Sequence, residues 1–463
     1  MKSTKQQQHE RIVERFPHHH ETYFRRPDIS RRGLLQMAGG LAGSFLFTPT
    51  AAVAAPTSKA AGVTPINKAE NVIFILLTGA PSHTDTFDFK MVNGVTPASF
   101  NPARVNGVMW PTGLLPKMSQ QMPNMAIMRS VQSWALVHTL AQVWSQIGRS
   151  PAAALGDIAP NIGSIVAIEK GVENSVFPPF LALNAAAGVG SGYLSTEFAP
   201  FRVNYGSSGT STGIPNTTNT LGESRFKTLT DRMQQIDGGL RQSQSEYRDY
   251  DQFYSAARRM MYNNTVQSAF SYTSAESAAY GSSSFGNACL VAKKALRANQ
   301  GTKFVQINFG SWDHHNEIYA EDTLPAMAKQ LDAGYAQLLA DLKNDGLLDK
   351  TLVVMTGEFG RTVGKLSGSN GRDHWKQQST IFAGAGVKGG RALGETDATG
   401  ADTVNYGWSE ERYVRPEDIE ATIYSAMGID WTTVRYDDPF GRGFEYVPFG
   451  GAGLYRPIDE LWK

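Results

Sequence analysis

The chain has 463 residues, with 43 Lys and Arg against 42 Asp and Glu, so its formal net charge at pH 7 is +1. This balance excludes the basic surface that nucleic-acid-binding proteins present and the acidic tail of many disordered effectors. A chain of this length folds as one large α/β unit or as about two to three domains. We therefore expect a globular protein that does not bind nucleic acid.

An export signal is predicted at the amino terminus. Arg31 and Arg32 precede a short apolar run that glycines interrupt and Pro49 ends, which is typical of a twin-arginine signal. The run is shorter than the roughly 20 apolar residues of a membrane span, and small residues at 52–55 fit a cleavage site. We predict that residues 1–55 are a twin-arginine signal peptide. The protein is then periplasmic or secreted, has no stable membrane span, and meets the twin-arginine translocase during export.

The only cysteine is Cys289, so the exported chain contains no internal disulfide. Cys289 opens an apolar segment, and we interpret it as a small buried hydrophobic residue.

Strand and helix patterns alternate along the rest of the chain. Short apolar runs rich in β-branched residues predict strands, and apolar residues at spacings of three and four predict helices. This alternation predicts an α/β fold, a three-layer αβα sandwich with a mainly parallel central sheet. The predicted strands are 71–78, 124–130, 303–309, 351–356 and 380–384; the predicted helices are 324–342, 224–261 and one that begins at 415–416 with Pro416.

We predict a single domain over residues 56–463, with insertions at about 186–222 and 263–286. Both insertions are rich in Gly, Ser, Thr, Asn and Tyr. They are long surface loops or loops that shape the mouth of a site.

Polar clusters follow the predicted strands, where ligands of open α/β sheets bind. They lie at 79–88, 310–317, 357–362 and 371–375. Four of the five histidines beyond residue 20 fall within them. Helix capping explains one such cluster but not the joint pattern, and carboxylate with imidazole suits zinc, manganese or iron. The fifth histidine, His138, has two open interpretations, an ordinary hydrogen-bonded side chain or a ligand.

These motifs resemble a known family. The segment Gly79–Asp88, the Trp312-Asp313-x-His315 motif, and the segments Gly357–Thr362 and Gly371–Trp375 occur in the order found in the exported bacterial family called domain of unknown function 1501. That family is grouped with the alkaline-phosphatase-like superfamily, which includes sulfatases. The resemblance implies an αβα sandwich, one or two divalent metal ions and a hydroxyl nucleophile.

The resemblance also assigns roles to residues. Asp313 and His315 are implied to be one pair of metal ligands, with Glu358, Asp373 and His374 as further ligands and Asp85 as the ligand near the first strand. The nucleophile is implied to be Ser82, Thr84 or Thr86. For Arg361 and Arg372 two roles stay open, binding of the substrate anion or a salt bridge to Glu358 or Asp373.

The predicted function is therefore an exported metal-dependent hydrolase that acts on phosphate or sulfate esters of small molecules or glycans. Zinc is the first expectation for the metal, with manganese, calcium or magnesium as alternatives. The competing hypothesis is a non-catalytic exported protein that keeps the fold and binds glycan, envelope polymer or a partner protein.

Overall fold

The computed structural model describes residues 57–463 except 153–155, 157, 186–188, 208 and 242–253. The predicted signal peptide at residues 1–55 lies outside the described residues. Within the described ranges, no helix combines the length and the apolar character needed to cross a bilayer.

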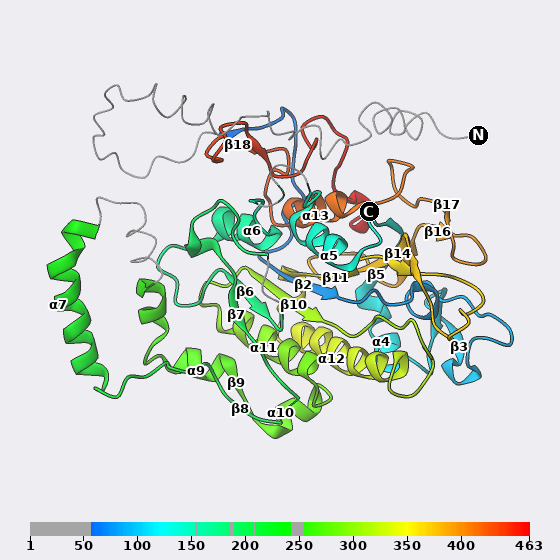
Figure 1. Cartoon of the computed structure of the whole chain (residues 1–463), viewed down its shortest axis with the longest axis horizontal. Helices are drawn as coiled ribbons and strands as arrows, with labels where there is room; N and C mark the ends of the chain where they lie inside the picture. Colours follow the sequence, from blue (N-terminus) through cyan, green and yellow to red (C-terminus); the bar gives the residue numbers. More distant parts are fainter. Residues whose placement is uncertain (1–56, 153–155, 157, 186–188, 208, 242–253) are drawn as a thin grey trace.

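An eight-stranded sheet forms the centre of the molecule, in the order β15-β5-β14-β11-β2-β10-β6-β7 (Figure 1). Neighbouring strands are parallel except where β14 pairs with β11 and with β5, so β14 alone runs against the others. The predicted mainly parallel sheet is confirmed. The strands are β2 (Asn71–Leu77), β5 (Met125–Gln132), β6 (Phe180–Leu183), β7 (Phe201–Val203), β10 (Phe304–Phe309), β11 (Thr351–Gly357), β14 (Gln377–Ala383) and β15 (Arg391–Leu393).

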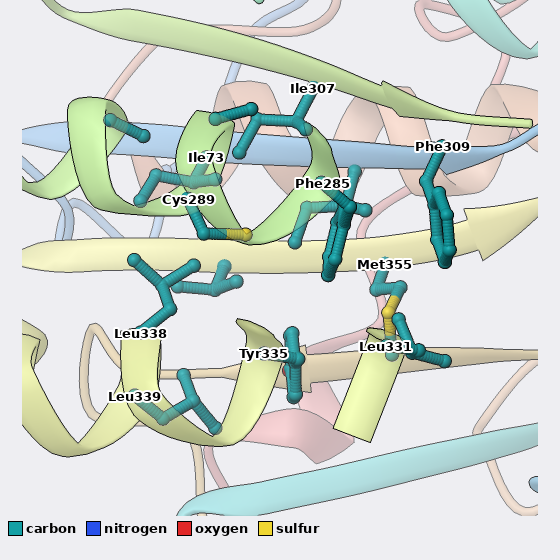
Figure 2. Packing of buried hydrophobic residues seen from close by; sticks show 14 of the residues in the cluster. Ile73, Phe285, Cys289, Ile307, Phe309, Leu331, Tyr335, Leu338, Leu339 and Met355 are labelled. Atoms are coloured by element: carbon teal, nitrogen blue, oxygen red, sulfur yellow. The ribbon is translucent and has the colours of Figure 1, made fainter. Parts of the chain in front are cut away.

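Both faces of the sheet are buried, which explains why its central strands are apolar without a break. Side chains of β2 alternate between the two faces, with Ile73, Ile75 and Leu77 in one core cluster and Val72, Phe74 and Leu76 in the other. Figure 2 shows the first cluster, in which Cys289 lies among aliphatic and aromatic side chains. The expectation that Cys289 is a buried hydrophobic residue is confirmed.

Helices cover the two faces of the sheet and complete the three layers (Figure 1). One layer contains α4 (Pro116–Gln120), α11 (Ser284–Ala298) and α12 (Leu324–Asn344). The other contains α5 (His138–Ile147), α6 (Ile162–Lys170) and α13 (Pro416–Ala426). The predicted αβα sandwich is therefore confirmed, including the two helices expected to begin near residues 324 and 416.

Three regions differ from the sequence prediction. The region 186–222, expected to be a loop, contains β7, which belongs to the central sheet. The helix expected at 224–261 is described as α7 (Glu223–Arg241) and a helical stretch at 254–260, with residues outside the description between them. The region 263–286, expected to be a loop, contains α9 (Asn264–Phe270) and α10 (Ser274–Ala279). Asn263 and Thr273 cap these two helices, so part of the polar composition that suggested a loop consists of capping residues.

Short elements lie outside the main sheet and the helical layers. The two-residue strands β12 (Gly360–Arg361) and β13 (His374–Trp375) pair with each other beside the carboxyl end of β11. The other short strands are β1 (Thr57–Ser58), β3 (Pro102–Val105), β4 (Val108–Pro111), β8 (Ser211–Thr212), β9 (Ser271–Tyr272), β16 (Glu395–Thr396), β17 (Thr403–Asn405), β18 (Val434–Arg435) and β19 (Phe444–Glu445), and the short 3-10 helices include η1 (His83–Asp85).

The three central strands end at the same level. In the sheet register, Leu77 at the end of β2 lies opposite Phe309 of β10 and Gly357 of β11. The chain segments that follow these strands therefore leave the sheet side by side. This register brings the polar clusters at 79–88, 310–317 and 357–362 to one edge.

Candidate metal centre

Two glycines let the loops at this edge approach closely. Gly79 has a φ of +96°, and a Cβ there would lie 2.8 Å from the backbone nitrogens of Trp312 and Asp313. A Cβ at Gly371 would lie 2.0 Å from the carbonyl carbon of His315. Any larger side chain at these two positions would separate the loops. The glycines of the motifs thus explain how the clusters come into contact.

Among the described residues, one group can hold a metal ion: His138, Asp313, His315 and His374, whose candidate ligand atoms all lie within 4.8 Å of one another. The members come from three places in the fold. Asp313 and His315 follow β10, His374 begins β13, and His138 begins α5. All four side chains are partly exposed, so solvent reaches the group.

The distances between these atoms suit one small ion. His315 Nε2 lies 2.9 Å from Asp313 Oδ1 and 3.2 Å from His374 Nε2. His138 Nε2 lies 3.4 Å from Asp313 Oδ2, and His374 Nε2 lies 4.0 Å from Asp313 Oδ1. A tetrahedral zinc site with Zn–N bonds of 2.0–2.1 Å separates neighbouring ligand atoms by about 3.3 Å. The donor set of three imidazoles and one carboxylate therefore fits zinc in its chemistry, and the separations of 2.9, 3.2 and 3.4 Å lie near the tetrahedral value.

Two of the imidazoles are oriented by acceptors behind them. The ring nitrogen Nδ1 of His374 lies 2.7 Å from the carbonyl oxygen of Leu136, and Nδ1 of His138 lies 2.5 Å from Glu358 Oε1. Each contact places the proton on Nδ1 and leaves Nε2 as the free electron-pair donor. His138 Nε2 is buried and has no hydrogen-bond partner among the described residues. A buried nitrogen without a partner is costly unless something binds it.

Arg361 holds the carboxylate of the group. Its Nη2 donates to Asp313 Oδ1 at 2.5 Å, and its Nη1 donates to His315 Nε2 at 3.3 Å. Partial burial works against the charge of Asp313, but the hydrogen bond and charge of Arg361 outweigh it and keep the pKa of this carboxyl below its ordinary value. Burial, followed by the charge of Arg361, lowers the pKa of His374. Both side chains are therefore deprotonated at neutral pH, as metal ligands must be.

Arg361 has no donor left for a substrate within the described structure. Its Nε donates to Ala80 O at 2.9 Å, Nη1 also donates to Arg372 O at 3.2 Å, and Nη2 also donates to Gly79 O. The side chain is almost completely buried. Of the two roles that the sequence left open, the structure places Arg361 in a salt bridge, with Asp313 rather than Glu358 or Asp373 as the partner.

Asp85, expected to be a ligand, lies in a second buried group with Arg372. Arg372 Nε donates to Asp85 Oδ2 at 2.6 Å, and its Nη2 donates to Oδ1 at 3.3 Å. The same carboxylate accepts hydrogen bonds from Ser82 Oγ at 2.6 Å and from Tyr319 Oη at 2.8 Å. Asp85 is fully buried. Its charge is balanced and its oxygens are occupied, and the four-residue group does not include it.

The three hydroxyls proposed as nucleophiles are also buried. Ser82 donates to Asp85, and Thr86 Oγ1 donates to the carbonyl oxygen of Ser82 at 2.7 Å. Thr84 Oγ1 has no partner within the described ranges. His83, from the same motif, is buried as well and contacts Gly400 O through Nε2 at 2.9 Å. The motif after β2 thus forms a packed support beneath the edge.

Two more expected ligands lie beside the group rather than in it. Asp373 is 74% exposed, and its Oδ1 lies 3.8 Å from His315 Nδ1. Glu358 directly follows β11, is fully buried and accepts from Gly79 N at 2.8 Å as well as contacting His138. Burial raises the pKa of Glu358, and the contact with His138 opposes this shift.

Sequence reasoning left the role of His138 open, and the structure brings it into the group. The position of His138 in the segment after β5 could have indicated this role. β5 runs in the same direction as β11, so its carboxyl end lies at the same edge, and His138 begins α5 six positions after its last residue, Gln132. A search for ligand residues in the segment after every parallel strand would have found His138.

The chain belongs to the family described as "Protein of unknown function (DUF1501)", whose model matches residues 69–450. The resemblance stated from the motifs is therefore confirmed. The match covers β2, β10 and β11 and all four residues of the group. No curated protein matches the sequence.

Solved structures similar to this chain share little sequence with it. They include a protein of the alkaline phosphatase superfamily from Vibrio parahaemolyticus, with 11% identity, coverage of 88% of this chain and 77% of that chain, and a TM-score of 0.40. The lipoteichoic acid synthase LtaP from Listeria monocytogenes has 12% identity, 84% and 79% coverage, and a TM-score of 0.38. The C-terminal periplasmic domain of EcEptC from Escherichia coli, in complex with Zn, has 8% identity, 81% and 85% coverage, and a TM-score of 0.37.

Proposed function

We propose that this protein is an exported hydrolase of phosphate or sulfate esters that uses one divalent metal ion bound by His138, Asp313, His315 and His374. The observation that carries the proposal is the buried Nε2 of His138, which has no hydrogen-bond partner among the described residues and faces Asp313 Oδ2 at 3.4 Å. Three imidazoles favour zinc over calcium or magnesium, which prefer all-oxygen sites, and manganese is the alternative. The partly exposed group leaves access for a small-molecule or glycan ester.

The residues of the chain fix the geometry of the site before substrate arrives. Leu136 and Glu358 set the orientations of His374 and His138, and Arg361 holds Asp313. A bound divalent ion supplies a Lewis acid that polarises the ester oxygen and makes water a stronger nucleophile near neutral pH. Arg361 adds a fixed positive charge beside the developing negative charge of the transition state.

Water is the nucleophile in this proposal. The hydroxyls of Ser82 and Thr86 donate hydrogen bonds within a buried support and would have to break them to attack an ester. Thr84 Oγ1 is buried beside them and is the remaining hydroxyl candidate. Thr84→Val, which replaces the hydroxyl by a methyl group of similar size, is therefore expected to keep activity. Loss of activity in this variant would indicate that Thr84 is the nucleophile.

A screen with matched variants tests the hydrolase. Zinc- or manganese-loaded protein is assayed against nitrophenyl phosphate, bis-nitrophenyl phosphate and nitrophenyl sulfate. We expect His315→Ala to abolish turnover and metal binding, whereas His314→Ala, a change at the adjacent half-buried histidine outside the group, keeps both. Turnover that persists in His315→Ala, or absence of turnover with every ester in fully loaded protein, contradicts the proposal.

We also propose export through the twin-arginine translocase to the periplasm or the medium. The support is the Arg31-Arg32 motif with its short apolar run. Replacing both arginines with lysine is expected to keep the full-length chain inside the cell, and cell fractionation measures this. Export at the wild-type level by the double variant would contradict the route.

The burial of all three candidate hydroxyls favours a second candidate function. In it the protein is exported, keeps the metal and the fold, and binds glycan, envelope polymer or a partner protein without catalysis. A metal-loaded protein that cleaves none of the esters but binds envelope polysaccharide in a metal-dependent way supports this function instead.

A further inference from the structure

We propose that Glu358 is a positioning residue that acts through His138, setting this imidazole so that Nε2 is its metal-binding atom. This inference deepens the proposed function and rests on its metal site. Glu358 Oε1 lies 2.5 Å from Nδ1 of His138. The opposite ring nitrogen, Nε2, faces Asp313 Oδ2 at 3.4 Å and is otherwise unpartnered among the described residues. The carboxylate therefore lies on the far side of the ring from the group.

The backbone fixes Glu358 where this role requires it. The residue directly follows Gly357, the last residue of β11, so the central sheet sets its starting point. Its Oε1 also accepts a hydrogen bond from Gly79 N at 2.8 Å, and the side chain is fully buried. One carboxylate oxygen thus ties the segment after β2 to the first residue of α5. A rigidly held acceptor is what a fixed imidazole orientation needs.

Phe359 packs against the same rings. Its ring centroid lies 4.9 Å from that of His138 and 4.6 Å from that of His374, and the side chain is fully buried. Glu358 sets which nitrogen of His138 carries the proton, and Phe359 limits the tilt of both rings. Two consecutive residues after one strand therefore shape the arrangement of two ligands without belonging to the four-residue group.

The two oriented imidazoles differ in the charge behind them. His374 contacts a neutral backbone carbonyl, that of Leu136, whereas His138 contacts a carboxylate. A carboxylate behind an imidazole raises the basicity of the ligating nitrogen, and loss of such a partner typically costs about 10- to 100-fold in metal affinity. We therefore expect the charge of Glu358 to strengthen metal binding while its oxygens stay off the metal.

A double-mutant cycle on zinc affinity tests this role. The dissociation constant is measured for the full mature chain with a chromophoric chelator as competitor. We expect Glu358→Gln to weaken zinc binding by about 10- to 100-fold. In a His138→Ala background the same change is expected to have almost no further effect, because Glu358 acts through the removed ring. Glu445→Gln, a change at a partly buried carboxylate on β19, serves as the control and keeps wild-type affinity.

Two outcomes would overturn the proposal. Zinc affinity unchanged by Glu358→Gln shows that the carboxylate does not support the ligand. A full loss that persists in the His138→Ala background shows that Glu358 contacts the metal itself. Glu358→Asp, which keeps the charge but withdraws it by one methylene, supplies a second variant and is expected to weaken binding as well. Because zinc affinity is the readout, protein that binds zinc tightly but cleaves no ester refutes the hydrolase and leaves this role standing.

Discussion

Two groups of charged side chains lie at the carboxyl edge of the sheet, and they are built in opposite ways. Asp85 and Arg372 are fully buried and paired with each other, and further donors occupy the carboxylate. The group around Asp313 is partly exposed and contains three imidazoles, one with a buried nitrogen that makes no hydrogen bond to any described residue. Both groups come from motifs that contain Asp and His. The candidate ligand group is thus distinguished by partly exposed nitrogen and oxygen donors that lie within 4.8 Å of one another, not by the mere presence of Asp and His.

The difference predicts which group stabilises the fold and which binds a ligand. A buried ion pair that loses one member leaves an uncompensated charge, whereas a solvent-accessible ligand group tolerates the loss of a member until its metal is added. Measurements of stability and of metal binding should therefore separate the two groups.

The largest expected effect is on folding at the buried pair. Asp85→Asn leaves the Arg372 guanidinium buried without its counter-charge, so we expect the free energy of unfolding to fall by about 3–5 kcal/mol. Urea denaturation of metal-free protein measures this. Any folded fraction should still bind zinc with near wild-type affinity. A folded, stable variant that has lost zinc binding would show that Asp85 belongs to the metal site.

The metal group should affect stability only when the metal is present. With free zinc at 100 times its dissociation constant, the wild type should gain about 2.7 kcal/mol of unfolding free energy. His315→Ala should lose this gain, while its metal-free stability changes by no more than about 0.5 kcal/mol, as for exposed substitutions. Thermal denaturation with and without zinc tests both statements, with His314→Ala as the control. A large loss of unfolding free energy in metal-free His315→Ala would show that His315 has a structural role.

A third site, the buried Glu417 carboxyl, sharpens the comparison because its expected effect is a dependence of stability on pH. Burial raises the pKa of Glu417 from 4.5 to about 7, despite hydrogen bonds from the indoles of Trp134 and Trp144. The folded state therefore holds a proton that the unfolded state releases. The contribution of the protonated Glu417 carboxyl to stability is complete below pH 4.5 and is lost as the pH rises toward about 7.

Glu417→Gln should flatten this dependence, removing a slope of at most about 1.4 kcal/mol per pH unit. Unfolding free energies of metal-free protein between pH 5 and 8 measure it. An unchanged slope would show that Glu417 does not carry this proton.

The sequence predicted the central sheet well because its strands are buried on both faces and apolar without interruption. It missed β6, β7 and β15, which are short, and it could not show that β14 runs against its neighbours, because strand direction depends on the connections. The insertion at 263–286 was interpreted as a loop because capping residues and loop residues have the same composition.

The candidate site was predicted in part. Asp313, His315 and His374 were named from their motifs, and the structure brings them together with His138. Motif composition could not separate Asp313 from Asp85, because their surroundings come from residues distant in the chain, such as Tyr319. For the same reason the orientation of His138 by Glu358, across 220 positions of sequence, was not visible before the fold was known.

The central claim is that one divalent ion binds at His138, Asp313, His315 and His374. Anomalous diffraction at the zinc edge from crystals of zinc-loaded protein tests it most directly. The account predicts one strong anomalous peak per chain, within bonding distance of Nε2 of each histidine and of an Asp313 carboxylate oxygen, with Asp85 still paired to Arg372. A peak coordinated by Asp85, or no peak at the four-residue group, would contradict it.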